Sequence, residues 1–335
     1  MSEINIITGG ISSGKTTKCL DIIGKIKSDN PESQIIIIVP EQHSYAAEKI
    51  TADRFGGTGL NGIEVLTFSR MAKRYLPRAV KNYLTPSGKA VLITKAAENA
   101  CSENSIYKDS AKKPGFAGNI MSMISELKRF MITPDMIKYS ANHLDDCILK
   151  QKLTAISEIY TEYEQLNNNR FLDSDDDLMR FAEKIMTDNL FKGYSIFIDE
   201  FSDFLPQHYK IIEALSQKSE KMYVTLPLSD TFPTVLSEIP ADTYNKIKRL
   251  SEKLNISFSE TKLSKEGLGF KSEEISFLYN NYSRAYKKDF SPYPEKTKDI
   301  TIFSGRDAYS ETEYAARKIN ALVCEKNFNF SDITI

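Results

Sequence analysis

Short apolar runs alternate along the chain with longer segments in which apolar residues recur at helical spacing. The runs most typical of strands lie at 4–7, 34–39, 64–67, 195–198 and 222–226. The run at 34–39, QIIIIV, is apolar after its first residue, as is typical of a strand buried on both faces. Helical spacing follows the first run, at Cys19, Leu20, Ile22, Ile23 and Ile26. Strands that alternate with helices predict an α/β fold with a mainly parallel sheet.

The pattern changes between about Leu76 and Lys192, where no run is typical of a strand. Helical spacing appears in two stretches, at Ile120, Ile124, Leu127 and Met131 and at Leu153, Ile156, Tyr160, Tyr163 and Leu166. Thr133-Pro134 is typical of a helix start, with a capping residue followed by proline in the first turn. We therefore predict an all-helical subdomain at 78–189, inserted into an α/β core.

The acidic run DSDDD, which begins at Asp173, is open to two interpretations. Clustered carboxylates suggest a metal site, whereas acids at the start of a helix stabilise its first turn. The second interpretation is favoured, with a helix beginning near Leu178.

The remaining segments complete the predicted organisation. The core lobe comprises 1–77 and 190–230, and 231–295 is expected to be a helical or linker region. Ile300–Phe303 is typical of a strand and is followed by a helical face, so 296–335 is expected to begin a second α/β lobe that is cut short. Because the last residues, SDITI, form an apolar run at the end of the sequence, we expect the chain to be a fragment of a longer protein.

Composition narrows the possible function. The 44 Lys and Arg residues are balanced by 45 Asp and Glu residues, so a nucleic-acid surface would have to be a local patch. The four cysteines are scattered and predict neither a disulfide framework nor a zinc site, as expected in a reducing compartment. No apolar run approaches the roughly 20 residues that span a bilayer, and the N-terminus lacks the features of a signal peptide. The sequence predicts a cytoplasmic protein without a membrane span.

A glycine-rich stretch directly follows the first predicted strand. Gly9, Gly14, Lys15 and Thr16 fit the pattern G-x-x-x-x-G-K-[ST], and a helix is predicted to follow. In such a loop, backbone N–H groups surround phosphate oxygens, the lysine reaches the β- and γ-phosphates, and the hydroxyl binds Mg²⁺. The predicted ATP-binding residues are Gly9, Gly10, Ile11, Ser12, Ser13, Gly14, Lys15, Thr16 and Thr17. The alternative is a glycine-rich turn before an ordinary helix.

An acidic pair, Asp199-Glu200, ends the predicted strand in YSIFIDEFSDF. Acids at the carboxyl end of a buried parallel strand lie where α/β sheets bind ligands. Asp199 is expected to hold Mg²⁺ through water and Glu200 to orient or deprotonate the attacking water. The alternative is a strand that runs into an acidic loop.

Two further segments, VPEQHSYAAEKI and VLTFSRMAKRYL, carry a family resemblance together with the loop and IDEFSDF. The chain resembles, over essentially its whole length, the N-terminal part of the AddB/RexB family, the B subunits of the bacterial ATP-dependent helicase/deoxyribonuclease. The resemblance implies a P-loop NTPase core that is superfamily 1 helicase-like and RecA-like, with a helical insertion. It also implies an AddA-type partner, single-stranded DNA and duplex ends as substrates, and the repair of double-strand breaks by recombination. The family's iron–sulfur cluster belongs to a C-terminal nuclease domain that is absent from this sequence.

By position, the resemblance assigns catalysis to Lys15, Asp199 and Glu200, and Mg²⁺ to Thr16 and Asp199. It assigns contact with single-stranded DNA to Thr67, Phe68, Ser69 and Arg70. Phe68 could stack on a base or be a core residue at a strand end. The basic residues at 70, 73, 74, 78 and 81 could contact phosphates or form a solvated helix face.

The sequence departs from an active helicase in two places. No Gly-Asp-x-x-Gln follows YVTLPLSD, and no glutamine motif precedes the loop. We therefore expect ATP binding with weak or no motor activity in the isolated chain. The alternative function is a non-catalytic scaffold that recognises single-stranded DNA and retains a relic P-loop. A small-molecule kinase would need a lid of clustered arginines, which the sequence lacks.

Overall fold

The structure is a computed structural model that describes residues 2–56, 61–77, 82–101, 105–113, 115–168, 170–228, 234–263, 269–286 and 291–335. The chain divides into two compact units, Met1–Leu268 and Gly269–Ile335. Within the described ranges, no helix is both long enough and apolar enough to cross a membrane.

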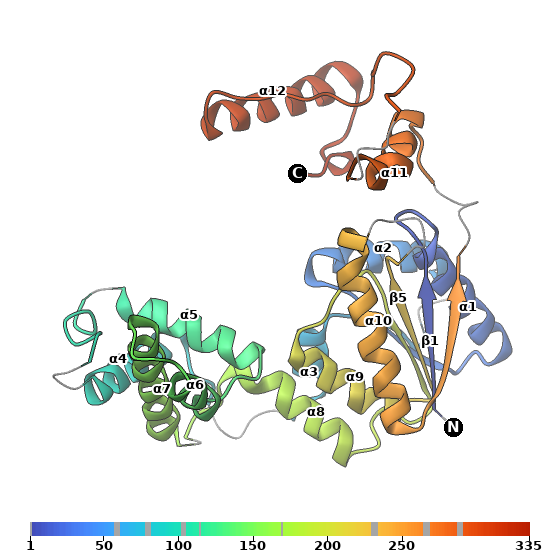
Figure 1. The fold of residues 1–335 in the computed structure, drawn as a ribbon. Coiled ribbons are helices and arrows are strands. Elements are labelled where there is room, and N and C mark those ends of the chain that lie inside the picture. The colour runs from blue at the N-terminus through green and yellow to red at the C-terminus, as the bar shows by residue number, and fades with distance from the viewer. Residues whose placement is uncertain are drawn as a thin grey trace. The chain divides into compact units, whose positions relative to one another are not determined.

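Six parallel strands form the centre of the first unit (Figure 1). Their order in the sheet is β3-β2-β4-β5-β1-β6. The strands are β1 Glu3–Thr8, β2 Gln34–Ile38, β3 Ile63–Leu66, β4 Tyr194–Ile198, β5 Lys221–Leu226 and β6 Ser257–Lys262. The five strands predicted from apolar runs are present and parallel, so the α/β prediction is confirmed.

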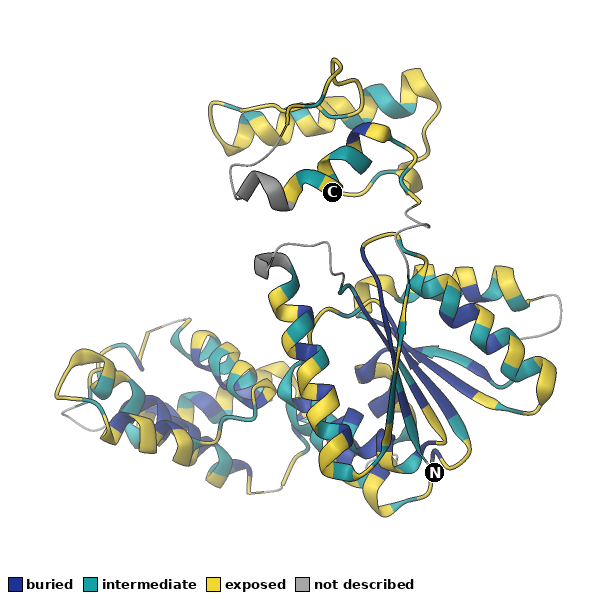
Figure 2. Cartoon of the chain, turned by 45° about the vertical axis from the view of Figure 1, so that its right-hand side comes forward, coloured by how far each residue is buried: buried dark blue, intermediate teal, exposed yellow. Residues whose placement is uncertain are grey.

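Successive side chains of a strand point to opposite faces of the sheet, so the apolar strands present an apolar surface on each face. Helices cover both of these faces. Ile36 and Ile38 belong to one apolar cluster, and Ile35 and Ile37 belong to the other. The first face packs against α3 Phe68–Tyr75, α8 Asp177–Thr187, α9 Pro206–Lys218 and α10 Thr234–Leu254. The second packs against α1 Lys15–Asp29 and α2 Ser44–Phe55, which follows the short helix η1 Glu41–His43. The four central strands, β2, β4, β5 and β1, are buried along most of their length (Figure 2).

Strand β6 is not predicted by the sequence. This strand pairs in parallel with β1 and forms one edge of the sheet. Its residues, SFSETK, are mostly polar, and several side chains bond to β1 instead of packing in a core. Asn5 Nδ2 donates to Ser259 Oγ at 2.8 Å, and Thr8 Oγ1 donates to Glu260 Oε1 at 2.9 Å. This strand corrects the expectation of helical or linker structure across 231–295.

Within the predicted insertion at 78–189, the described residues between 82 and 187 form helices and a single strand-like bridge between Tyr83 and Leu172, but α8 at its end packs on the sheet of the core lobe. The elements of the insertion are α4 Pro86–Ala100, α5 Phe116–Arg129, α6 Pro134–Asn142, α7 Ile148–Asn167 and η2 Ser174–Asp176, which leads into α8. The insertion has its own apolar core, which includes Ile93, Ile124 and Tyr163. The predicted helix start is also confirmed, since the Thr133 side chain accepts a hydrogen bond from Met136 N and Pro134 is the first residue of α6.

The second unit contains α11 Glu273–Tyr286, α12 Ala308–Lys326 and η3 Phe330–Asp332. The expected strand at Ile300–Phe303 is wrong, because these residues form no strand. The backbone at 298–300 is held by the side chain of Glu274. The Glu274 carboxylate accepts hydrogen bonds from the N–H groups of Lys298, Asp299 and Ile300. The assignment of 296–335 to the start of a second lobe stays a prediction.

Candidate functional site

The glycine-rich loop lies between the carboxyl end of β1 and the start of α1. Gly9 and Gly10 are buried, and Gly14 has a φ of 82°, a left-handed conformation that favours glycine. No side chain caps the N-terminus of α1. The first-turn N–H groups of a helix have no partner within the helix, so they remain available to an anion held by the loop.

Lys15 folds back over this loop. Its Nζ donates hydrogen bonds to the carbonyl oxygens of Gly10 at 2.8 Å and Gly9 at 3.2 Å. Burial lowers the pKa of Lys15, while the Glu200 and Asp199 carboxylates act in the opposite direction. The sheet order explains this proximity, because β1 and β4 are separated only by β5 and all three strands end at the same edge.

The acidic pair follows β4 directly. Asp199 is buried, and its N–H donates to Ile38 O at 2.9 Å. Glu200 has a φ of 66°, which is uncommon for a residue with a side chain. Glu200 Oε1 accepts a hydrogen bond from Thr16 Oγ1 at 3.1 Å. The structure therefore brings together four residues that the sequence predicts as a site, namely Lys15, Thr16, Asp199 and Glu200.

Thr225, on β5, is not among the residues that the sequence predicts for the site. It is buried between the loop and the acidic pair, and its Oγ1 donates to Asp199 Oδ1. A possible signal is the hydroxyl residue near the end of the otherwise apolar run YVTL. A cavity of about 370 Å³ opens at this edge of the sheet. It is lined by Ile11, Ser12, Ser13, Gly14, Lys15, Thr16, Glu200, Phe201, Ser202, Thr225 and Pro227.

The residues present fit a phosphate group and Mg²⁺. Ser13 Oγ is buried and has no hydrogen-bond partner among the described residues. The backbone of Gly9 lies close to the Ser13 side chain, since a Cβ on Gly9 would lie 2.3 Å from Ser13 Oγ. The Thr16 hydroxyl and the Asp199 carboxylate are the hard oxygen ligands that Mg²⁺ prefers. The described residues contain no group of three or more His, Cys, Asp or Glu side chains suited to a metal.

The candidate DNA residues begin α3, which follows β3. Thr67 is buried and caps α3, accepting from Arg70 N at 3.2 Å and donating to Glu41 Oε1 at 2.6 Å. Phe68 is only 3% exposed, and its ring stacks on His208 with centroids 4.4 Å apart. Of the two interpretations of Phe68, the structure favours the core residue over the base-stacking residue.

The other candidate contacts lie at the surface. Ser69 and Arg70 are exposed, and Arg70 forms an ion pair with Glu48. In the basic run that follows, Arg74 pairs with Glu64 at 2.8 Å. Arg78 and Lys81 lie outside the described residues. Partly exposed surface ion pairs of this kind contribute little to stability, so these arginines stay available to a phosphate.

His208 gives a pH-dependent prediction. Burial lowers its pKa from 6.5 to about 4, while Asp203 acts in the opposite direction. The unfolded chain therefore binds more protons than the folded chain between pH 4 and 6.5, so stability falls as the pH falls through this window. Because one pKa unit corresponds to 1.36 kcal/mol, the loss is at most about 3 kcal/mol.

The measurement is urea unfolding from pH 7 to pH 4 for the wild type and His208→Phe, which retains a ring beside Phe68 but does not titrate. We expect the wild type to lose more stability than the variant across the window. Parallel profiles would contradict the prediction.

Comparison with known proteins identifies the family. A family model described as "ADDB, N-terminal" matches residues 6–279. The B subunit of the ATP-dependent helicase/deoxyribonuclease of Clostridium novyi (strain NT) is 33% identical over 346 residues, which cover 99% of this chain and 30% of that protein. The protein of the same name from Clostridium acetobutylicum is 32% identical over 343 residues, covering 99% and 29%. The chain thus spans about 30% of the length of these relatives. Since the match extends over nearly all of its residues, the chain belongs to the AddB family and corresponds to its N-terminal part.

Proposed function

We propose that the chain is the nucleotide-binding, helicase-like region of the B subunit of a DNA helicase/nuclease complex. In this proposal the fold is a P-loop NTPase lobe of the superfamily 1, RecA-like class. The observation that carries it is the convergence of Lys15 and Thr16 with Asp199 and Glu200 beside one cavity, at the carboxyl ends of strands that lie close together in the sheet. This is where open α/β sheets bind ligands.

Each residue has a distinct role in the proposal. The loop N–H groups and the Lys15 ammonium bind the phosphates of ATP, and Thr16 and Asp199 hold Mg²⁺. When bound, Mg²⁺ neutralises charge on the phosphate oxygens. Glu200 orients or deprotonates the attacking water. Thr16 donates its proton to Glu200, so the lone pairs of the hydroxyl oxygen remain for the metal.

The names of the relatives support the wider role. They are B subunits of an ATP-dependent helicase/deoxyribonuclease. We extend this to an AddA-type partner, to DNA as substrate and to the processing of double-strand breaks for recombinational repair in the cytoplasm. The iron–sulfur cluster and nuclease activity belong, in this proposal, to a region outside the 335 residues.

We expect the chain by itself to show weak or no motor activity, since the sequence lacks the Gly-Asp-x-x-Gln segment after β5. The alternative, a non-catalytic scaffold that recognises single-stranded DNA and keeps a relic P-loop, would have to use the exposed Ser69 and Arg70. Phe68 supports it less, because its ring is packed in the core.

Gly9→Ala tests the proposal. A Cβ at this position would lie 2.3 Å from Ser13 Oγ and 3.2 Å from Leu263 Cβ, so the loop must shift. Since the loop N–H groups move with it, we expect the affinity for Mg·ATP, measured by calorimetry, to fall about tenfold, or about 1.4 kcal/mol.

The matched control is Gly118→Ala, in α5, where an added Cβ meets nothing within 4 Å. It should leave nucleotide affinity unchanged. Equal affinity of the Gly9→Ala variant and the wild type, or no binding by the wild type, would refute the nucleotide-binding function.

A further inference from the structure

The Asp199 carboxylate is held by a neighbouring strand as well as by its own backbone. Thr225 Oγ1 donates to Asp199 Oδ1, and the N–H of Glu200 donates to the same oxygen at 3.0 Å. Thr225 and Asp199 are each at most 3% exposed. Both donors are neutral, so they fix the orientation of the carboxylate without cancelling its charge.

The second carboxylate oxygen has a different environment. Across the part of the chain that the structure describes, Asp199 Oδ2 receives no hydrogen bond and forms no ion pair. The two donors on Oδ1 therefore restrict rotation of the carboxylate and leave Oδ2 for another ligand. A carboxylate oriented in this way is suited to a cation or to water bound to a cation.

Thr225 also contacts the backbone of the second acid. The N–H of Glu200 lies 3.4 Å from Thr225 Oγ1, which can accept this hydrogen bond while donating to Asp199. Glu200 has a left-handed backbone, a conformation that persists only where neighbouring groups hold it. One hydroxyl thus contacts both acidic residues of the candidate site, and Thr225 also lines the cavity.

We propose that Thr225 is a positioning residue, whose hydroxyl orients Asp199 so that Oδ2 is presented to nucleotide-bound Mg²⁺ and holds Glu200 in place beside it. The inference rests on the proposed nucleotide function and assigns a role to a residue that the loop and acid motifs do not include. Nucleotide binding then has two parts, one that depends on Mg²⁺ and one that depends on the contacts of the loop with phosphate. Only the Mg²⁺-dependent part needs the Thr225 hydroxyl.

The test is calorimetry of ADP binding to the 335-residue chain, with Mg²⁺ in one arm and with EDTA in the other. Thr225→Val keeps the shape of the side chain and removes its hydroxyl, and Thr225→Ser restores the hydroxyl. We expect the Thr225→Val variant to bind ADP about tenfold more weakly than the wild type with Mg²⁺, and less than about twofold more weakly with EDTA. The affinity of the Thr225→Ser variant for ADP should stay within about twofold of the wild type in both arms.

Thr94→Val is the matched control, because the Thr94 hydroxyl donates to Ala90 O within α4 and lies far along the chain from the site. It should change neither arm. If Thr225→Val does not fold, Thr225→Ala carries the same expectation, since it removes the hydroxyl and adds no bulk.

The outcomes separate the two claims. A Val variant that matches the wild type with Mg²⁺, or a Ser variant that is as weak as Val, would overturn the role of the hydroxyl while leaving the nucleotide site intact. A loss that is equal in both arms would also overturn it, because it would reflect a general disturbance of the site. A wild-type chain that binds ADP in neither arm would instead refute the proposed function itself.

Discussion

Lys15→Ala is expected to weaken Mg·ATP binding by about 100-fold or more. Burial lowers the pKa of the Lys15 ammonium, while the nearby charges of Glu200 and Asp199 act in the opposite direction. Without this ammonium, a triphosphate that enters the cavity meets two carboxylates and no compensating cation from the loop. A hydrogen bond to a charged group contributes about 1.5–3 kcal/mol, and the uncompensated repulsion adds to that loss, so a change of this size follows.

The measurement is calorimetry at fixed ionic strength, because the charge effect is screened by salt. Lys25→Ala is the matched control, since Lys25 lies exposed on the same helix, α1. It should bind as the wild type does. Equal binding by Lys15→Ala and the wild type would show that the glycine-rich loop is an ordinary turn, the alternative that the sequence leaves open.

The sequence predicts those features that depend on neighbours along the chain. The runs at β1, β2 and β4 are apolar because both faces of each strand are covered, so local composition is enough to identify them. The same holds for the loop at Gly9–Thr16, whose glycine spacing, preceding strand and following helix all lie between Glu3 and Asp29.

Features that depend on tertiary contacts escape such reasoning. The polar sequence of β6 gives no strand signal, because this edge strand pairs with β1 alone and several of its polar side chains form hydrogen bonds with side chains of β1. Burial of Phe68 depends on His208, which lies 140 positions later, so the sequence leaves its role undecided. Thr225 becomes part of the site only because β5 lies between β1 and β4.

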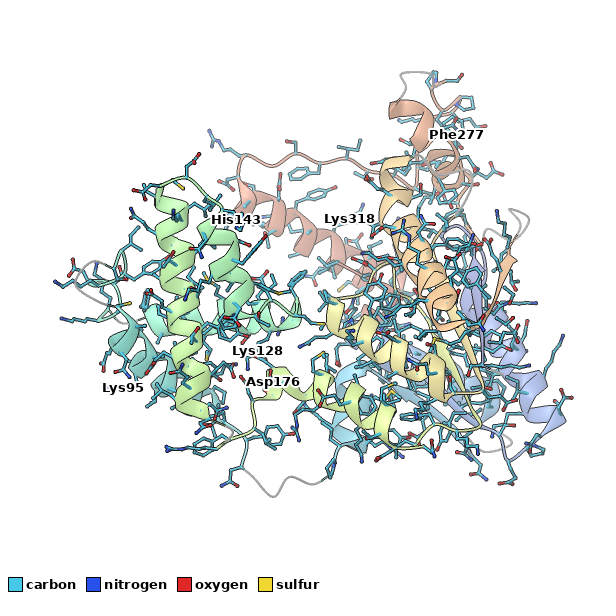
Figure 3. The ribbon with its side chains drawn as sticks, turned by 60° about the horizontal axis from the view of Figure 1, so that its bottom comes forward. Lys95, Lys128, His143, Asp176, Phe277 and Lys318 are labelled. Carbon is cyan, nitrogen blue, oxygen red and sulfur yellow. The ribbon has the colours of Figure 1, made fainter. Side chains whose placement is uncertain are left out.

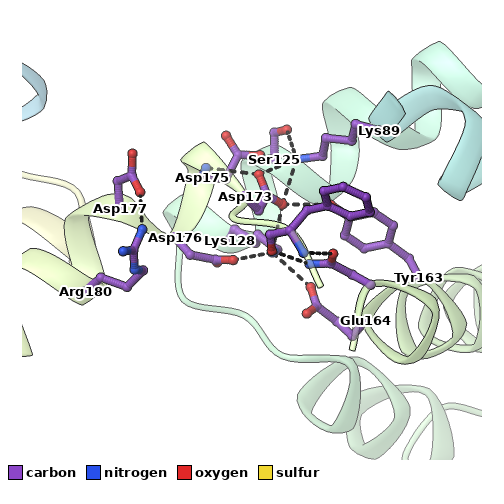
Figure 4. A network of polar contacts seen from close by, with 12 residues as sticks. Lys89, Ser125, Lys128, Tyr163, Glu164, Asp173, Asp175, Asp176, Asp177 and Arg180 are labelled. Atoms are coloured by element: carbon purple, nitrogen blue, oxygen red, sulfur yellow. Dashed lines mark hydrogen bonds and ion pairs between the residues drawn. The ribbon is translucent and has the colours of Figure 1, made fainter. Parts of the chain in front are cut away.

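The acidic run that begins at Asp173 has one role that the sequence predicts and one that it does not. The sequence predicts that it caps a helix near Leu178, and the run does lead through η2 into α8, which begins at Asp177. Its first residue has a second role that the sequence does not reveal. Asp173 is buried and bonds to the ammonium groups of Lys89 and Lys128, each at 3.0 Å, and to the hydroxyl of Tyr163 at 2.8 Å (Figure 4).

This network joins four elements of the insertion. Lys89 comes from α4, Lys128 from α5 and Tyr163 from α7, and the acids come from the segment at η2. The ammonium of Lys128 also pairs with Asp176 at 2.8 Å, and these two side chains lie together in Figure 3. Burial alone would raise the pKa of Asp173, but the two lysines lower it to about 2, so the carboxylate is charged at neutral pH.

The network also connects the insertion to the core lobe. Gln207, in the first turn of α9, is 2% exposed. Its Nε2 donates to Lys128 O at 3.0 Å and to Asp175 O at 3.1 Å. Since α9 follows the loop after Glu200, the main-chain carbonyl groups of Lys128 and Asp175 hold one end of the segment that carries the candidate catalytic acid.

Asp173→Asn is therefore expected to destabilise the chain by about 3 kcal/mol. The substitution keeps the volume and can still accept from Tyr163, but it removes the carboxylate shared by two buried ammonium groups. Removing one partner of a buried ion pair costs about 3–5 kcal/mol, and the remaining pairs with Asp175, Asp176 and Glu164 place the effect at the lower end. Urea unfolding at pH 7, followed by circular dichroism, measures this loss of stability.

The matched control is Asp145→Asn, because Asp145 is exposed. It should change stability by less than about 0.5 kcal/mol. If both variants unfold at the same urea concentration, the network does not contribute to stability through the charge of Asp173, and the hydrogen bonds of Gln207 would have to hold the insertion against α9 without it.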